Sequence, residues 1–121
     1  VYCFDINISK FIYYSKNINV FGLNIKDKKK VEKTLSKINS ESNSNFFDII
    51  IDDGLHAPHA NLEVLLFGTK LLKKGGWLVI EDIEKASVPI WQLVINILNR
   101  KKFMPYIYKA NYGYLFALKK K

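Results

Sequence analysis

The sequence predicts an α/β fold with a Rossmann-like, mostly parallel sheet that closes on a C-terminal antiparallel hairpin. Short apolar runs alternate along the chain with segments of helical periodicity, which is the pattern of strands and helices taken in turn. The apolar runs are continuous, as in strands that are covered on both faces. Strands that alternate with helices predict a mostly parallel sheet covered by the helices. Each crossover between its parallel strands is expected to be right-handed.

The first part of the chain predicts strand, helix, strand and helix. The expected elements are a strand at 1–5, a short helix at 8–14, a strand at 19–24 and a lysine-rich helix from 28. Val31, Leu35 and Ile38 recur at i, i+4 and i+7, which gives the second helix one apolar face. The polar segment 39–45 is expected to be a surface loop.

The second part contains the clearest strand, FFDIIIDD at 46–53. A helix at 61–72 follows, and we expect it to end in a cationic last turn and a glycine stop at 73–76. The remaining expected elements are a strand at 77–80, a helix at 88–98 with Pro89 in its first turn, and hairpin strands at 103–108 and 112–118.

Length and composition limit the class of protein. A chain of 121 residues predicts a single domain over 1–121, and hydrophobic and charged shares of 49% and 25% are those of a globular protein. No apolar run approaches the roughly 18 to 20 residues that span a bilayer. Cys3 is the single cysteine, which excludes an internal disulfide and favours the cytoplasm.

The net charge of +8 comes mainly from lysine, since Arg100 is the only arginine. Proteins that recognise nucleic acids favour arginine, because its planar guanidinium group matches guanine and phosphate. Binding of nucleic acid therefore ranks last among the functions considered. Lys28, Lys29 and Lys30 are interpreted as a solvated helix face. The terminal residues 119–121 are interpreted as a frayed tail.

Acidic side chains gather at the expected carboxyl ends of strands, although the chain is basic. They are Asp5, Asp52, Asp53, Glu81 and Asp82. Ligands of open α/β sheets bind outside these strand ends, and adjacent strands lie only about 4.8 Å apart. If the strands ending at Asp53 and Glu81 are neighbours, their carboxylates can hold a hard cation such as Mg²⁺ or Ca²⁺. The alternative is that Asp52 and Asp82 cap the following helices.

His56 follows Asp53 by three residues and lies where the strand leads into the helix. An imidazole at this place can act as a general base. A hydrogen bond to the backbone is the alternative, and the sequence does not decide between them. His59 is interpreted as a histidine hydrogen-bonded to the backbone. The alternating aromatic residues of 103–116 are interpreted as packing residues of the strands.

Residues 47–83 resemble the central segment of class I S-adenosylmethionine-dependent methyltransferases, in particular the metal-dependent sugar O-methyltransferases of macrolide biosynthesis and their cephalosporin-hydroxylase-like relatives. The likeness consists of the turn DDGLH, the segment LLKKGG and the pair ED that ends the next strand. It implies a Mg²⁺ site at Asp53, Glu81 and Asp82, with His56 and Asp53 as catalytic residues.

The same resemblance implies that S-adenosylmethionine is the cofactor. Its contacts are expected from Asp5 at the ribose, from Asn24 in the segment GLNIKD at the adenine, and from Asp52. Leu55 stands where the family has serine. The family's first strand and its glycine-rich loop have no counterpart before Val1, so we expect weak cofactor affinity.

The family's sheet order is 3-2-1-4-5-7-6, so the strand without a counterpart is the central one. Unpaired buried backbone groups cost about 1 to 3 kcal/mol each. We therefore expect that the flanking strands pair directly, that another copy contributes a strand, or that a further N-terminal segment completes the sheet. The expected function is that of an O-methyltransferase fragment acting on a hydroxyl of a small molecule or sugar, inactive or weakly active alone. The alternative is a non-catalytic structural or oligomerising domain.

Overall fold

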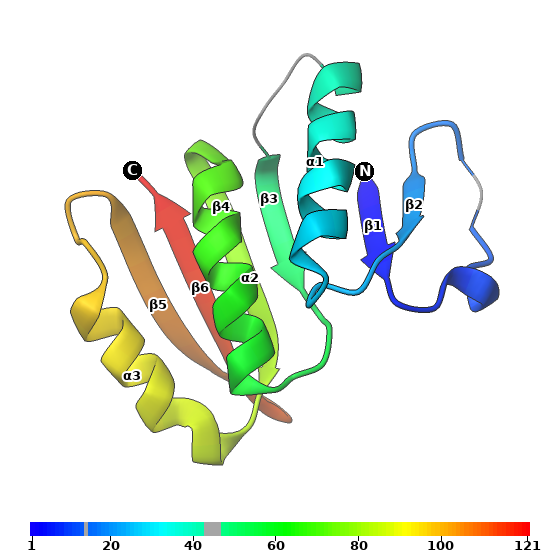
Figure 1. Ribbon diagram of the computed structural model, residues 1–121. Coiled ribbons are helices and arrows are strands. Elements are labelled where there is room, and N and C mark those ends of the chain that lie inside the picture. The colour runs from blue at the N-terminus through cyan, green and yellow to red at the C-terminus, as the bar shows by residue number, and fades with distance from the viewer. Residues whose placement is uncertain (14, 43–46) are drawn as a thin grey trace. The chain divides into compact units, whose positions relative to one another are not determined.

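The computed structural model describes residues 1–13, 15–42 and 47–121 of the chain. They form two compact units, Val1–Ser44 and Asn45–Lys121. The first unit holds a two-stranded sheet of order β1-β2, and the second a four-stranded sheet of order β3-β4-β6-β5 (Figure 1). The prediction of one domain over 1–121 stays a prediction.

The first unit begins with two parallel strands, β1 at Tyr2–Asp5 and β2 at Asn19–Gly22. The helix expected at 8–14 is reduced to the single 3₁₀ turn η1, Ile8–Lys10, because the backbone is already extended at Phe11. Isolated helices of so few residues are marginal in water, which explains the difference. Tyr14 lies outside the described residues.

Helix α1, Lys28–Ser42, begins at a side-chain cap. Oδ1 of Asp27 accepts a 3.1 Å hydrogen bond from the backbone amide of Lys30 and so satisfies one of the free donors of the first turn. Val31 and Ile38 are buried, as the periodicity predicts. The helix extends through Ser42, so the loop expected at 39–45 is wrong for its first residues, and 43–45 lie outside the described residues. Serine and asparagine weaken a helix too little to end it.

The second unit combines four strands with two α-helices. Its elements are β3 at Phe47–Asp52, α2 at Pro58–Leu71, β4 at Leu72–Ile83, η2 at Lys85–Ser87, α3 at Val88–Ile97, β5 at Phe103–Ala110 and β6 at Gly113–Lys120. β3 and β4 are parallel, whereas β6 is antiparallel to both β4 and β5. The α/β class with a closing antiparallel hairpin is thus confirmed.

Helices α2 and α3 lie on the same face of the four-stranded sheet (Figure 1), and the core lies beneath them. Trp91 of α3 packs on Phe116 of β6 with ring centroids 4.7 Å apart. On the opposite face, Ile49 and Ile51 each remain 60% exposed. The continuous apolar run of β3 predicts that other residues cover both faces of the strand. The described residues of this unit cover only the face that packs against the helices.

The end of α2 differs from its prediction. The helix ends at Leu71, and Lys73, Lys74 and Gly75 already belong to β4. The pairing of β3 with β4 passes from Phe47↔Leu72 to Ile49↔Trp77, so the intervening residues bulge out of the ladder, and Gly75 has a left-handed φ of 82°. The glycine thus serves this bulge instead of a helix stop.

Lys120 of β6 brings a positive charge to the end of α2, whose own last turn contains Lys70. Nζ of Lys120 donates hydrogen bonds to the carbonyl oxygens of Thr69, at 3.2 Å, and Leu72, at 2.8 Å. The positive charge therefore meets the carbonyl end of the helix, where cations are favoured. The interpretation of 119–121 as a frayed tail is wrong, because β6 extends to Lys120 and the amide of Lys121 bonds to the carbonyl of Lys102.

Among the described residues, the strand pairs lie within one unit or the other, and the direct pairing considered for the strands 1–5 and 46–53 stays a prediction. β1 pairs with β2, and β3 is an edge strand of the other sheet. Within each unit the strand order agrees with the corresponding part of 3-2-1-4-5-7-6. Among the described residues, no helix has both the length and the apolar character needed to cross a bilayer.

Candidate metal site

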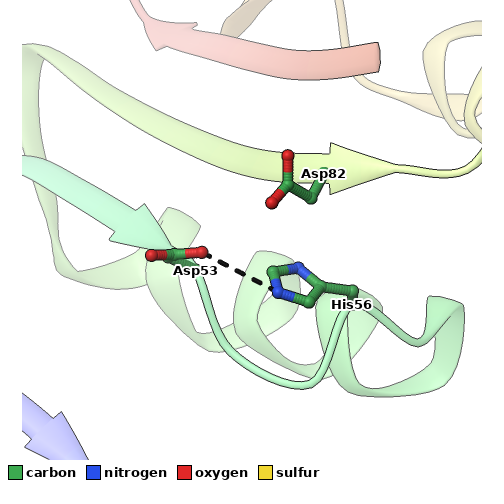
Figure 2. A group of neighbouring side chains, drawn as sticks. All are labelled: Asp53, His56 and Asp82. Carbon is green, nitrogen blue, oxygen red and sulfur yellow. Dashed lines mark ion pairs between the residues drawn. The ribbon is translucent and has the colours of Figure 1, made fainter. Parts of the chain in front are cut away.

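Three side chains converge at the carboxyl ends of β3 and β4. Asp53, His56 and Asp82 each offer one ligand atom, and these atoms all lie within 4.8 Å of one another. Figure 2 shows the three side chains pointing toward one another, Asp53 and His56 from the segment between β3 and α2 and Asp82 from β4. This is the group that the described residues offer to a cation.

The parallel register of β3 and β4 explains why the two acidic segments meet. Asp52, the last residue of β3, is paired with Ile80 of β4, so Asp53 follows β3 beside the part of β4 that contains Glu81 and Asp82. The chain then turns back at His56, whose φ of 52° is left-handed and brings the imidazole toward Asp53. Few residues other than glycine adopt this backbone conformation.

Asp82 reaches the group because the end of β4 is irregular. The pairing of β4 with β6 shifts register between Ile80 and Ile83, and both isoleucines are buried. With strict alternation Asp82 would have pointed to the core. Between these two pairs β4 has one residue more than β6, and this extra residue turns Asp82 away from the core. The backbone of Asp82 is left-handed, with a φ of 51°. Glu81, which the resemblance implies as a ligand, is half-buried and outside the group of three.

The site is open to solvent and rich in negative charge. The side chains of Asp53 and His56 are 67% and 39% exposed, and Nε2 of His56 lies 3.8 Å from Oδ1 of Asp53. That separation is too long for a hydrogen bond. Two carboxylates at such distances repel unless a positive charge lies among them. The arrangement therefore suits a divalent cation or an imidazolium.

Asp52 has a different surrounding from Asp53. Its Oδ2 accepts a 2.8 Å hydrogen bond from the side-chain amide of Asn61, and its Oδ1 accepts one of 3.3 Å from the amide of Gly54. Asn61 is only 2% exposed. Asp52 thus fastens the first turns of α2 to the end of β3. Sequence reasoning missed Asn61, although an amide within an apolar helix was the available signal.

Neither aspartate considered as a helix cap acts as one. The N-cap of α2 is Ala57 and that of α3 is Ser87, and neither helix start has a side-chain cap hydrogen bond. Asp52 contacts α2 through Asn61 instead, and Asp82 faces His56 and Asp53. The sequence could not show this, because a cap and a ligand both need a short carboxylate at a strand end.

Asp5 and Asn24 belong to the first unit. Oδ1 of Asp5 accepts a 2.8 Å hydrogen bond from the amide of Asn7, and Oδ1 of Asn24 accepts one of 3.0 Å from the amide of Lys26. Both side chains thus stabilise local turns. Their expected contacts to a cofactor, like that of Asp52, stay predictions.

Comparison with known proteins finds no matching family model and no matching curated protein. Solved structures do match. An rRNA methylase from Streptococcus thermophilus is 18% identical, with 98% of this chain and 72% of that chain covered and a TM-score of 0.59. A putative ribosomal RNA methyltransferase from Plasmodium falciparum is 12% identical, with 100% and 71% covered and a TM-score of 0.72. The chain has the methyltransferase fold.

A third match is MycE, a methyltransferase of the mycinamycin biosynthetic pathway whose structure contains Mg and SAH. It is 17% identical over 98% of this chain, with a TM-score of 0.68. The chain spans 36% of the length of MycE. Identities this low establish the likeness of fold and leave substrate and metal to be argued from the residues.

Proposed function

We propose that this chain is part of an S-adenosylmethionine-dependent O-methyltransferase that transfers a methyl group to a hydroxyl of a small molecule or sugar with the help of a divalent cation. The observation that carries the proposal is the convergence of Asp53, His56 and Asp82 at the strand ends of a methyltransferase fold. The structure of MycE, in which Mg and SAH occur together, supports it.

The donor atoms of the site fit a divalent cation. Asp53 and Asp82 supply carboxylate oxygens, which such ions prefer, and Glu81 precedes Asp82 as a candidate for a further donor. When bound, the cation would polarise the acceptor hydroxyl and lower its pKa. The residues themselves hold the acceptor in line with the methyl donor, and His56 or a carboxylate takes the hydroxyl proton.

For the cofactor we propose contacts from Asp5, Asn24 and Asp52. Each already accepts an internal hydrogen bond, but a carboxylate has about four lone-pair sites, so Asp5 retains capacity for ribose hydroxyls. Asp52 is the least available of the three, because both of its oxygens accept hydrogen bonds within the protein. Weak binding of S-adenosylmethionine by this chain is the expected result.

The test combines cofactor binding with methyl transfer. S-adenosylmethionine carrying a labelled methyl group is offered with a panel of sugar hydroxyl acceptors, with added Mg²⁺ or with EDTA. We expect weak transfer, which EDTA and Asp53→Ala abolish and Asp48→Ala leaves unchanged, because Asp48 pairs with Lys73 at the other end of β3. Transfer that persists in Asp53→Ala would remove the metal from the proposal.

The open face of the second unit favours a second candidate function, that of a non-catalytic oligomerising domain. Ile49 and Ile51 of β3, with Met104 and Tyr108 of β5, are exposed while their neighbours along each strand pack on the core. β3 is also an edge strand, whose backbone can pair with another strand. We propose that a second copy of the chain covers this surface.

Light scattering after gel filtration tests this candidate. The wild-type chain is expected to be a dimer or larger, and the pair Ile49→Lys and Ile51→Lys to be monomeric. Leu93→Lys is the matched control, because Leu93 is 61% exposed on α3, on the helical side of the sheet. A monomeric wild-type chain, or an equal response in the control, would contradict the candidate.

A further inference from the structure

We propose that His56 is a ligand of the cation rather than the base of the reaction, and that the site therefore prefers borderline divalent metals such as Co²⁺ and Zn²⁺ to Mg²⁺. The inference rests on the metal site of the proposed function. In this arrangement the third ligand of the cation, beside Asp53 and Asp82, is the imidazole of His56 and not the carboxylate of Glu81.

The placement of the donor atoms supports this exchange. Bonds from a metal to nitrogen or oxygen are about 2.0 to 2.2 Å long, which places neighbouring ligand atoms about 3 Å apart. Nε2 of His56 and Oδ1 of Asp53 are 3.8 Å apart, so a small side-chain rotation brings them to that separation. Both side chains are partly exposed, which leaves them room to rotate. Glu81 is half-buried and outside the group.

The direction of the imidazole supports it as well. Nε2 of His56 faces the Asp53 carboxylate without a hydrogen bond, and the carboxylate of Asp82 points from β4 toward the same two side chains (Figure 2). A cation among the three side chains would relieve the repulsion between the two carboxylates and would bind a nitrogen lone pair of the imidazole. A nitrogen whose lone pair binds a metal cannot also accept the proton of a substrate, so the two roles exclude each other.

The donor set then determines the metal. Mg²⁺ prefers oxygen ligands only, whereas imidazole suits Zn²⁺ and its neighbours among the first-row metals. A site of two carboxylates and one imidazole is thus better matched to Co²⁺ or Zn²⁺. We expect the wild-type chain to bind Co²⁺ more tightly than Mg²⁺, and we expect this preference to shrink when the imidazole is removed.

The chain offers a direct spectroscopic test, because His56 and His59 are its only histidines. Mn²⁺ is added to the tag-free chain, and pulsed electron paramagnetic resonance measures the coupling of the metal to directly bound ¹⁴N. We expect imidazole coupling in the wild-type chain and in His59→Asn, and none in His56→Asn. Asparagine tolerates the left-handed backbone of position 56, so the loop is retained.

Calorimetry with Co²⁺ and Mg²⁺ provides the second measurement. His56→Asn is expected to lower the affinity for Co²⁺ by about tenfold or more and to change that for Mg²⁺ much less. Mn²⁺ that binds in an Asp53-dependent manner without ¹⁴N coupling would overturn the inference and leave the proposed metal site intact. Absence of Asp53-dependent binding of any of these metals would overturn both.

Discussion

The side-chain amide of Asn61 donates a 2.8 Å hydrogen bond to the carboxylate of Asp52. Asp53, the next residue, instead points toward His56 and Asp82 (Figure 2). Two adjacent aspartates thus have different roles, one in holding α2 to β3 and the other in the candidate metal site. The division follows from the alternation of side chains along an extended backbone.

Replacement of Asn61 by alanine should destabilise the second unit. It leaves the Asp52 carboxylate without its buried partner, which costs about 1 to 3 kcal/mol. Urea denaturation followed by circular dichroism measures the change in the free energy of unfolding. Asp53→Asn is the control, because a surface substitution usually changes stability by less than about 0.5 kcal/mol. Equal losses in both variants would contradict the division of roles.

Replacement of Lys120 by methionine should also lower stability. The variant keeps the apolar stem and loses two hydrogen bonds to the end of α2, at Thr69 and Leu72. Hydrogen bonds to charged groups contribute about 1.5 to 3 kcal/mol, so a loss of that order is expected in urea denaturation. Lys109→Met, at an exposed position near the end of β5, serves as the control. If Lys120→Met and the wild-type chain have the same midpoint of urea unfolding, the lysine does not stabilise the helix end.

The helix α2 approaches β4 closely at Gly68. A Cβ at this position would lie 2.5 Å from Cδ1 of Leu78, a side chain with 0% exposure. Alanine favours a helix by about 1 kcal/mol over glycine, but overpacking costs about 1 to 3 kcal/mol. Gly68→Ala is therefore expected to lower the melting temperature, and adding Leu78→Val to recover part of the loss. A higher melting temperature in Gly68→Ala would refute the close contact.

Asp82 is held in a left-handed backbone conformation that glycine adopts without cost. Asp82→Gly should therefore be less destabilising than Glu81→Gly, which only weakens a strand. The expected difference between the two free energies of unfolding is about 1 kcal/mol or more, since a left-handed conformation costs about 1 to 2 kcal/mol in residues other than glycine. Both variants are compared by urea denaturation. A more stable Glu81→Gly would show that Asp82 is not strained.

The local pattern was sufficient for the elements whose apolar residues repeat clearly. The run FDIII, the helix with Pro89 in its first turn and the hairpin around Asn111 are all found in the structure. It was also sufficient to place acids at strand ends. It failed for 8–14 and 73–76, where neighbouring structure decides whether a short segment becomes a helix, a turn or a bulge.

By itself the sequence determined the α/β class, the parallel direction of β3 and β4, and the presence of carboxylates near the carboxyl ends of those strands. Only the tertiary structure decided which of them converge. A register shift between Ile80 and Ile83 brings in Asp82, and Asn61 draws Asp52 away. The reason is physical: periodicity along a strand depends on the nearest residues, whereas the direction of a side chain at its end depends on pairing with segments far away in the chain.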